Sequence, residues 1–352
     1  MRALVKYARG EGNIELRDIS EPECRAGEVL VEVEAAGICG TDVHILHDQT
    51  FYAPPVVIGH EYCGRVINVG EDVHGIEVGD RVTSPATVPC GECYLCRTNH
   101  QNRCTGSNKK ILGVSGANGA FAQLMVVPTK IIHKVPDRVS SESAALAEPI
   151  ACVVHAAIER VEIKPGESIV IQGPGAIGLI ATQIAAIQGA GQIIVTGTSA
   201  DKERLEIAVK LGADIAVNVE EEDPVKVVSD LTTGLGADVV LEASGSPAAR
   251  RQAFELVRRC GKIGYIGLTG RTKEEANLDN VVEKELSITG SWGTVWTSWR
   301  TTLALMASGK IRTDLLISHR LPLEDWKKGF DLMDSKEGLK ILLKPQERIG
   351  EN

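Results

Sequence analysis

Four cysteines lie close together in the chain, at Cys90, Cys93, Cys96 and Cys104. The spacing C-x2-C-x2-C-x7-C places four thiolates in one loop, enough to complete a tetrahedral zinc site with no open position. Such a closed site would be structural. An iron–sulfur cluster is the competing hypothesis, but the last gap is longer than in the bacterial ferredoxin pattern, and Thr105 rather than proline follows Cys104. The spacing therefore favours zinc.

A second group of possible metal ligands is scattered along the chain. Cys39 opens the segment CGTDVH, His60 and Glu61 follow Gly59, and Glu148 precedes a proline. Taken singly, each residue could be a buried thiol, a hydrogen-bonded core histidine or a charge at a helix edge. Together they supply a thiolate, an imidazole and a carboxylate, which zinc accepts when one position stays open for a substrate.

A glycine-rich turn, GPGAIG at 173–178, follows the apolar segment 168–172 and opens a helix-like segment. Its glycines would permit a tight turn, let a pyrophosphate approach the backbone and let the helix pack closely on the strand. The phosphates would then face the free N–H groups of the helix. The alternative is a purely structural glycine turn. The expected cofactor contacts in the turn are Gly173, Gly175, Ala176, Ile177 and Gly178.

The choice of dinucleotide depends on the end of the next strand, 192–197. The acidic residue that NAD-binding sequences carry about 20 positions after the turn is absent there. NADP(H) is therefore favoured over NAD(H), because uncharged, hydroxyl and basic residues could hold a 2′-phosphate. The competing interpretation is an NAD enzyme that tolerates the lost contact or uses Asp201 instead. The expected cofactor contacts in this segment are Gly197, Thr198, Ser199, Lys202 and Arg204.

The elements that must position these residues change along the chain. Residues 1 to about 150 have the pattern of short strands separated by turns, whereas 165–293 alternate between strand and helix, which predicts a parallel sheet with helices on both faces. The remainder has two helical segments and ends in the apolar stretch ILLKP, which could return to the first domain as a strand. We expect a β-rich catalytic domain (1–152 and 297–352) and a doubly wound α/β domain (153–296).

Composition narrows the possible partners. The chain has 352 residues, 43% of them hydrophobic, with 38 Lys and Arg against 47 Asp and Glu. The net charge of −9 argues against a nucleic-acid partner. The uncharged stretch 168–200 is long enough for a membrane span, but its glycines and proline fit a buried strand, turn, helix and strand better. Clustered cysteines without a secretory signal indicate a cytoplasmic protein.

The chain resembles the zinc-containing medium-chain alcohol dehydrogenases, and among them the sorbitol (polyol) and L-threonine dehydrogenases. The motifs that carry the resemblance span nearly the whole sequence in the same order. They are CGTDVH (39–44), GHEYCGRVINVG (59–70), GDRV (79–82), the four-cysteine segment (90–104), EP (148–149) and GPGAIG (173–178). The resemblance implies a GroES-like β-rich catalytic domain into which a Rossmann domain is inserted.

The resemblance also implies roles for individual residues. Cys39, His60 and Glu148 match the catalytic zinc ligands of the polyol branch, and Glu61 matches a carboxylate that can ligate the metal or lie just behind it. Thr41 matches the hydroxyl that takes the substrate proton, and His44 the histidine that passes it to solvent. Two zinc ions per chain follow, one catalytic and one structural.

The substrate is the least determined feature. Trp292, Trp296 and Trp299 follow the last Rossmann strand, and Trp296 is the candidate for a substrate wall, with interdomain or subunit packing as the alternative. We expect a secondary alcohol of a polyol or sugar, with L-threonine as the second candidate. A zinc- and nucleotide-binding sensor without catalysis is the alternative of another class. The relatives' pattern further implies a homo-oligomer, most simply a tetramer.

Overall fold

The computed structural model describes residues 1–270 and 273–347. The gaps at 271–272 and 348–352, which the sequence placed in the Rossmann and catalytic domains respectively, lie outside the described residues. The chain forms two compact units. The first contains Met1–Glu148, Thr294–Ala307 and the chain from Leu316 onward, and the second contains Pro149–Gly293 and Ser308–Leu315.

The second unit is built on a six-stranded parallel sheet in the order β14-β13-β12-β15-β16-β17. Numbered within the unit, this is 3-2-1-4-5-6, the order of dinucleotide-binding sheets. The interior of β12 is fully buried, as expected for a central parallel strand. The strands are β12 (Ser168–Gln172), β13 (Gln192–Gly197), β14 (Ile215–Asn218), β15 (Ala237–Glu242), β16 (Val257–Tyr265) and β17 (Ser287–Gly290).

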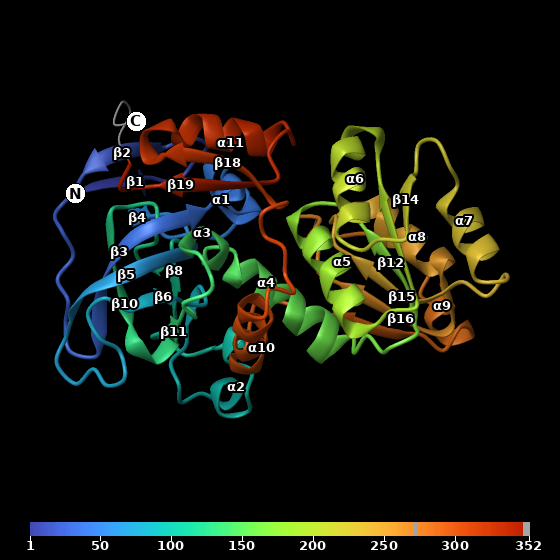
Figure 1. The fold of residues 1–352 in the computed structure, drawn as a ribbon, viewed down its shortest axis with the longest axis horizontal. Coiled ribbons are helices and arrows are strands. Elements are labelled where there is room, and N and C mark those ends of the chain that lie inside the picture. The colour runs from blue at the N-terminus through green and yellow to red at the C-terminus, as the bar shows by residue number, and fades with distance from the viewer. Residues whose placement is uncertain (271–272, 348–352) are drawn as a thin grey trace. The chain divides into compact units, whose positions relative to one another are not determined.

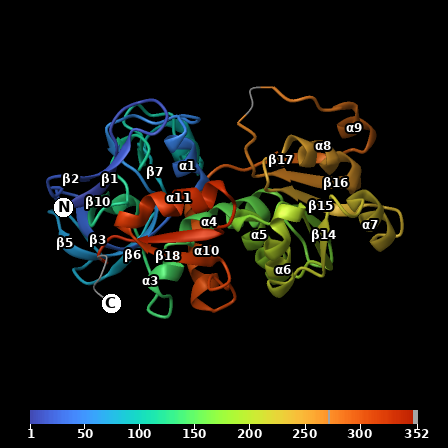
Figure 2. The same cartoon turned by 90° about the horizontal axis from the view of Figure 1, so that it is seen from above.

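Helices cover both faces of this sheet. In Figures 1 and 2, α5 and α6 lie on one face and α7 and α8 on the other. Two local features define the N-terminus of α7. Pro224 occupies its first turn, and the Asp223 carboxylate accepts a hydrogen bond from the Val225 N–H at 2.9 Å. The predicted doubly wound sheet is confirmed. The helices are α5 (Ala176–Gln188), α6 (Lys202–Lys210), α7 (Pro224–Leu231), α8 (Pro247–Leu256) and α9 (Asp279–Glu283).

The first unit is mainly antiparallel. Its largest sheet has seven strands, and the long strand β3 pairs with β5, β10 and β19. Along β3, Val29, Val31 and Val33 are buried and alternate with partly exposed residues, as one face of a sheet requires. The strands of the whole first unit are β1 (Arg2–Lys6), β2 (Ile14–Asp18), β3 (Glu28–Gly37), β4 (Val56–Val57), β5 (Glu61–Val69), β6 (Arg81–Thr83), β7 (Thr87–Val88), β8 (Lys110–Leu112), β9 (Gly116–Ala117), β10 (Leu124–Pro128), β11 (His133–Lys134), β18 (Ile317–Pro322) and β19 (Lys340–Lys344).

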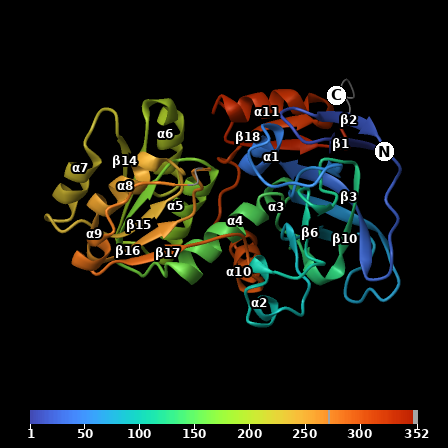
Figure 3. The ribbon, with the colours of Figure 1, turned by 180° about the vertical axis from the view of Figure 1, so that it is seen from behind.

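The C-terminal strands complete this sheet. β19 pairs with β3 through Leu342 opposite Gly37, and β18 pairs with β19. Figure 3 shows these strands (red) beside the N-terminal part of the chain (blue). The ILLKP segment therefore returns to the first unit, as predicted. The helices of this unit are α1 (Gly40–Leu46), α2 (Tyr94–Arg97), α3 (Ser141–Ala144), α4 (Ala147–Val154, which crosses into the second unit), α10 (Trp296–Ala307) and α11 (Trp326–Asp334).

The boundaries between units differ from the expected ones by a few residues. Thr294 to Trp296 belong to the first unit, because Trp299 of α10 stacks on His133 with ring centroids 4.8 Å apart. Residues 308–315 belong to the second unit, where the Arg312 N–H donates to Oε1 of Gln183 in α5 at 2.7 Å. Among the described residues, no helix is both long and apolar enough to cross a membrane. The uncharged stretch 168–200 instead forms β12, α5 and β13.

Candidate metal centres and dinucleotide site

Cys39 lies between β3 and α1, at the N-cap position of the helix. Its backbone N–H donates to Oδ2 of Asp42 at 2.9 Å, and the backbone N–H of Asp42 in turn faces the Cys39 side chain. This reciprocal capping box determines where the chain turns from strand to helix. It therefore also determines where the thiol points.

His60 immediately precedes β5, and Glu61 is the first residue of that strand. Gly59, just before them, has a φ of 92°, and a Cβ there would overlap the ring of Phe121. Glycine adopts this positive φ readily and has no Cβ to overlap the ring. The turn buries His60 and Glu61, which are 6% and 1% exposed.

The ligand atoms of Cys39, His60 and Glu61 all lie within 4.8 Å of one another. Sheet register brings them together, because Glu61 pairs with Gly37, two residues before Cys39. A side chain at Gly37 would place its Cβ 2.5 Å from the Glu61 carboxylate. A partly exposed thiol with a buried imidazole and a buried carboxylate suits a zinc ion with an open coordination position.

Asp42 lies behind this group, and sequence reasoning assigned it no role. It is fully buried, and its Oδ1 is 3.6 Å from Nδ1 of His60; neither atom has a hydrogen-bond partner among the described residues. Burial alone would lower the pKa of His60, but Asp42 and Cys39 raise it well above its ordinary value. A carboxylate behind an imidazole orients the ring of a metal-ligating histidine, and Asp42 is placed for this role behind His60. The available sequence signal was the three-residue capping-box spacing from Cys39 to Asp42.

Lys340 is a second residue that sequence reasoning missed. It begins β19, whose three central residues are apolar, and its Nζ lies 2.8 and 2.6 Å from the two carboxylate oxygens of Glu61. Nζ also donates to the carbonyl of Ile38 at 3.2 Å. Burial lowers the pKa of Lys340, but Glu61, Cys39 and Glu148 together raise it above its ordinary value. Glu61 is thus held by a buried cation beside the candidate metal position.

Glu148 lies in the first turn of α4 and is 9% exposed. It is not part of the group of ligand atoms formed by Cys39, His60 and Glu61. It nevertheless lies near enough to Lys340 to raise the pKa of that lysine. The structure therefore places Glu61, rather than Glu148, within ligand distance of the other two residues.

Thr41 and His44 lie on α1, three residues apart and so on neighbouring positions of one helix face. Thr41 is partly exposed, two residues after Cys39. His44 is exposed, and its Nδ1 is 3.2 Å from Oε1 of Gln49. The spacing sets a hydroxyl beside the candidate metal ligand and an imidazole in contact with solvent.

The four-cysteine loop closes on itself. The sulfur atoms of Cys93 and Cys96 are 3.5 Å apart, those of Cys90 and Cys96 3.8 Å, and those of Cys93 and Cys104 3.9 Å. Four thiolates around one zinc at ~2.3 Å are separated by ~3.8 Å, so the loop fits a single tetrahedral ion. Thiolates at the corners of a multi-iron cluster would be farther apart.

Electrostatics within the loop also fit a cation. Hydrogen bonds from the backbone N–H groups of Thr105 and Cys96 lower the pKa of Cys93 to about 5. Burial, together with hydrogen bonds to the neighbouring sulfurs, raises the pKa of Cys96 to about 12. Without a cation, neighbouring thiols therefore differ widely in pKa. A bound divalent ion would favour the ionised form of all four.

The glycine turn has the geometry of a dinucleotide cradle. Gly173 has a φ of 96°, and a Cβ on Gly178 would overlap the Gly173 carbonyl, so helix and strand pack closely here. A Cβ on Gly175 would meet nothing within 4 Å, which leaves open space above the turn. Gly175 caps α5, and Ala176 and Ile177 form its first turn. The backbone therefore fits a pyrophosphate at this helix end.

The residues expected to choose the dinucleotide lie together at the end of β13. Gly197 is the last residue of the strand, Thr198 and Ser199 follow, and Lys202 is exposed at the start of α6. The guanidinium of Arg204 lies 3.5 Å from Oδ1 of Asp201. Basic and acidic groups are thus both present at this strand end.

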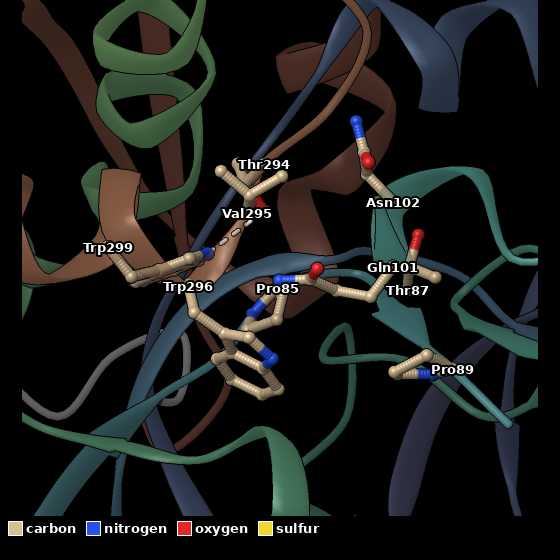
Figure 4. A pocket seen from close by; sticks show the side chains of 9 residues that line it. All are labelled: Pro85, Thr87, Pro89, Gln101, Asn102, Thr294, Val295, Trp296 and Trp299. Carbon is tan, nitrogen blue, oxygen red and sulfur yellow. Dashed lines mark hydrogen bonds between the residues drawn. The ribbon is translucent and has the colours of Figure 1, made fainter. Parts of the chain in front are cut away.

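The tryptophans have different environments. Trp299 is fully buried and donates from Nε1 to Oγ1 of Thr294 at 2.9 Å. Trp296 is 38% exposed, and its Nε1 donates to the side-chain oxygen of Gln101 at 3.2 Å. Figure 4 shows both around a pocket of about 10 Å³, the space of about one water molecule. Trp299 packs within the first unit, and Trp296 bonds to the cysteine-rich segment. The expected role of Trp296 as a wall of the substrate site stays a prediction.

Comparison with protein families gives two matches. The alcohol dehydrogenase GroES-like domain matches residues 25–137, and the zinc-binding dehydrogenase domain matches residues 176–308. The first match lies in the first unit, and the second lies mostly in the unit with the parallel sheet.

Individual relatives match over almost their full length. A sorbitol dehydrogenase of Halalkalibacterium halodurans is 37% identical over 98% of this chain and 99% of its own. An L-threonine 3-dehydrogenase of Pyrococcus horikoshii is 38% identical over 97% of this chain and 98% of its own. A solved zinc-binding dehydrogenase of Sinorhizobium meliloti, bound to NADP, has a TM-score of 0.91 and 30% identity over 98% of this chain and 99% of its own.

Proposed function

Because this chain belongs to the zinc-dependent medium-chain alcohol dehydrogenase family, we propose that it oxidises a secondary alcohol of a polyol or sugar at the Cys39–His60 centre. The cluster of the Cys39 thiol, the His60 imidazole and the Glu61 carboxylate carries this proposal, because a sensor or structural protein would not need an open metal site near a proton-accepting hydroxyl. The reaction class is that of an NAD(P)-dependent oxidoreductase acting on CH–OH groups.

We infer that Cys39 and His60 hold the catalytic zinc, with Glu148 and Glu61 as alternative carboxylates. In the described arrangement Lys340 holds Glu61. While that pair is intact, Glu148 on α4 is the alternative carboxylate ligand. Release of Glu61 by Lys340 would let it replace Glu148. The four-cysteine loop holds a second, structural zinc.

The chain's own residues then move the proton. When bound, zinc supplies Lewis acidity toward an alcohol, and the nicotinamide supplies the hydride acceptor. Thr41 accepts the proton at Oγ1, and His44, exposed on the same helix face, passes it to solvent. Asp42 keeps His60 oriented through each turnover.

The cofactor is a nicotinamide dinucleotide bound at Gly173–Gly178. The sequence favoured NADP(H), on the absence of an acid at Gly197 and the presence of Thr198, Ser199, Lys202 and Arg204. This preference stays a prediction, and the side-chain contacts at this strand end favour NAD(H) over NADP(H) instead. Comparing catalytic efficiencies with NAD⁺ and NADP⁺ measures it.

A substrate panel tests the function. The zinc-loaded protein is assayed with polyols, sugars and L-threonine, each with both cofactors, by the absorbance of the reduced nicotinamide. Turnover of a polyol or sugar that is lost in Cys39→Ser supports the proposal. L-Threonine is the second candidate, because the L-threonine 3-dehydrogenase relative is as similar as the sorbitol one. If the protein oxidises none of these alcohols, the proposal is contradicted.

We also infer a cytoplasmic homotetramer. All nine cysteines lie in the described ranges, and none of them forms a disulfide there, which suits a reducing compartment. β17 pairs only with β16 in the described part of the chain, and its other edge could pair with a second copy. Light scattering at micromolar concentration tests the assembly, and a monomer would contradict it.

A further inference from the structure

Packing explains why no acid occupies the end of β13. A Cβ on Gly197 would lie 2.9 Å from Cγ of Pro174, in the glycine turn, and 3.2 Å from Cβ of Asp201. An aspartate at 197 would therefore press against the turn that has to cradle the pyrophosphate. The carboxylate that binds the ribose in NAD-binding sequences must therefore come from another element, or be absent.

β14 provides such a group. It runs parallel to β13, with Asn218 opposite Gly197, and the Val219 N–H donates to the Gly197 carbonyl at 2.8 Å. Glu220 follows directly, and its Oε2 accepts a hydrogen bond from the backbone N–H of Ser199 at 3.0 Å. The Ser199 side chain also bonds Glu220, which lowers the pKa of that carboxyl. A negative charge thus stands beside the end of β13, 23 residues after Gly197.

The hydrogen-bond donors at this strand end are already used by carboxylates. Thr198 donates from its N–H and its hydroxyl to Oδ2 of Asp201, at 3.1 and 2.8 Å. Ser199 donates to Glu220, and Arg204 pairs with Asp201. A 2′-phosphate would have to displace two carboxylates to reach the donors of Thr198, Ser199 and Arg204. Lys202, which the sequence also assigned to it, is exposed at the start of α6.

We propose that Glu220 selects NAD(H) over NADP(H) by accepting a hydrogen bond from the 2′-hydroxyl of the adenosine ribose and repelling a 2′-phosphate. The inference rests on the dinucleotide site proposed above. Like charges at an exposed site repel weakly but measurably, and salt screens the effect. Glu220 replaces the acid that Pro174 and Asp201 exclude from Gly197.

Binding of cofactor fragments tests the proposal without catalysis. The affinities of the full chain for ADP-ribose and for 2′-phospho-ADP-ribose are measured by calorimetry at low and at physiological salt. The unmodified chain is expected to bind ADP-ribose more tightly. Glu220→Gln, which keeps an oxygen for the Ser199 N–H, is expected to shift the ratio of affinities toward the phosphorylated ligand by about tenfold at low salt, and less at high salt.

Glu222→Gln is the matched control, because it removes the same charge two residues away and keeps the backbone bond from Glu222 to Asn218. It is expected to leave the ratio unchanged. Tighter binding of the phosphorylated ligand by the unmodified chain, or equal shifts in both variants, would overturn the role of Glu220 while leaving the dinucleotide site intact. Binding of neither ligand would overturn the site itself, and the inference with it.

Discussion

The buried pair between Lys340 and Glu61 allows a quantitative prediction. The Lys340 and Glu61 side chains are 4% and 1% exposed, and Nζ reaches both carboxylate oxygens. Lys340→Met keeps a side chain as long as the hydrocarbon part of lysine and removes the charge. The Glu61 carboxylate is then buried without its cation, which typically costs about 3–5 kcal/mol. For a unit of about 200 residues this corresponds to a loss of roughly 6–20 °C in Tm.

The assay is urea unfolding of the metal-free chain, followed by tryptophan fluorescence. Trp296, Trp299 and Trp326 all lie in the first unit, so the signal reports mainly on the unit that contains the pair. Lys344→Met is the matched control on the same strand. Its ion pair with Glu142, at 3.1 Å, is partly exposed, and its loss is expected to cost about 1 kcal/mol or less.

Two further measurements isolate the cause. The double variant Glu61→Gln/Lys340→Met removes both charges and is expected to recover most of the lost stability, because no buried charge is left unpaired. Adding zinc to Lys340→Met is expected to recover part of it, since Glu61 can then turn to the metal. Equal costs for Lys340→Met and Lys344→Met in the metal-free chain would refute the reasoning.

Three further predictions concern the metals, the proton path and pH. Metal analysis should find two zinc ions per chain, and iron with visible absorption would contradict this. Cys93→Ser should lose one zinc ion and should lower the stability of the fold more than the turnover of the molecules that remain folded. Cys260→Ser, which lies outside both clusters, should keep both zinc ions. Thr41→Val should lower kcat by about 10²- to 10⁴-fold with dinucleotide affinity unchanged, and Thr41→Ser should retain most activity; equal turnover in both variants would rule out the proton-accepting role. The hydrogen bond to Asp334, at 2.9 Å, raises the pKa of His47, so the stability it contributes is fully present below about pH 6.5 and is lost as pH rises through the raised value. The urea midpoint of the unmodified chain should therefore exceed that of Asp334→Asn at pH 6, and the difference should disappear at high pH.

Much of the second unit could be predicted from the sequence. The segment QIIVTG forms β13 with the bounds that its pattern indicated, and the strands and helices of 168–210 follow the expected order. Parallel strands buried on both faces give continuous apolar runs that few other structures explain. Short strands such as β4 and β9 have two residues each and carry no such pattern.

Local spacing also determined the four-cysteine loop and the glycine turn. Cys90 to Cys104 are close along the chain, so their spacing alone limits how the sulfur atoms can meet. In the same way, Gly173 and Gly178 are five residues apart, and their close approach depends on one turn and the start of one helix. Such motifs depend on covalently near neighbours, and the sequence is enough to recognise them.

The contacts of Lys340 and Glu220 were decided only by the tertiary structure. Lys340 reaches Glu61 across 279 residues because β3 pairs with both β19 and β5. Glu220 reaches Ser199 because β14 lies beside β13 with Asn218 opposite Gly197. A shift of one residue in the β19 register would turn Lys340 to the other face of the sheet. A shift in the β14 register would move Glu220 relative to Ser199. Strand register is set by packing across the whole sheet, so the partner of a buried or strand-end charge cannot be identified from its own segment.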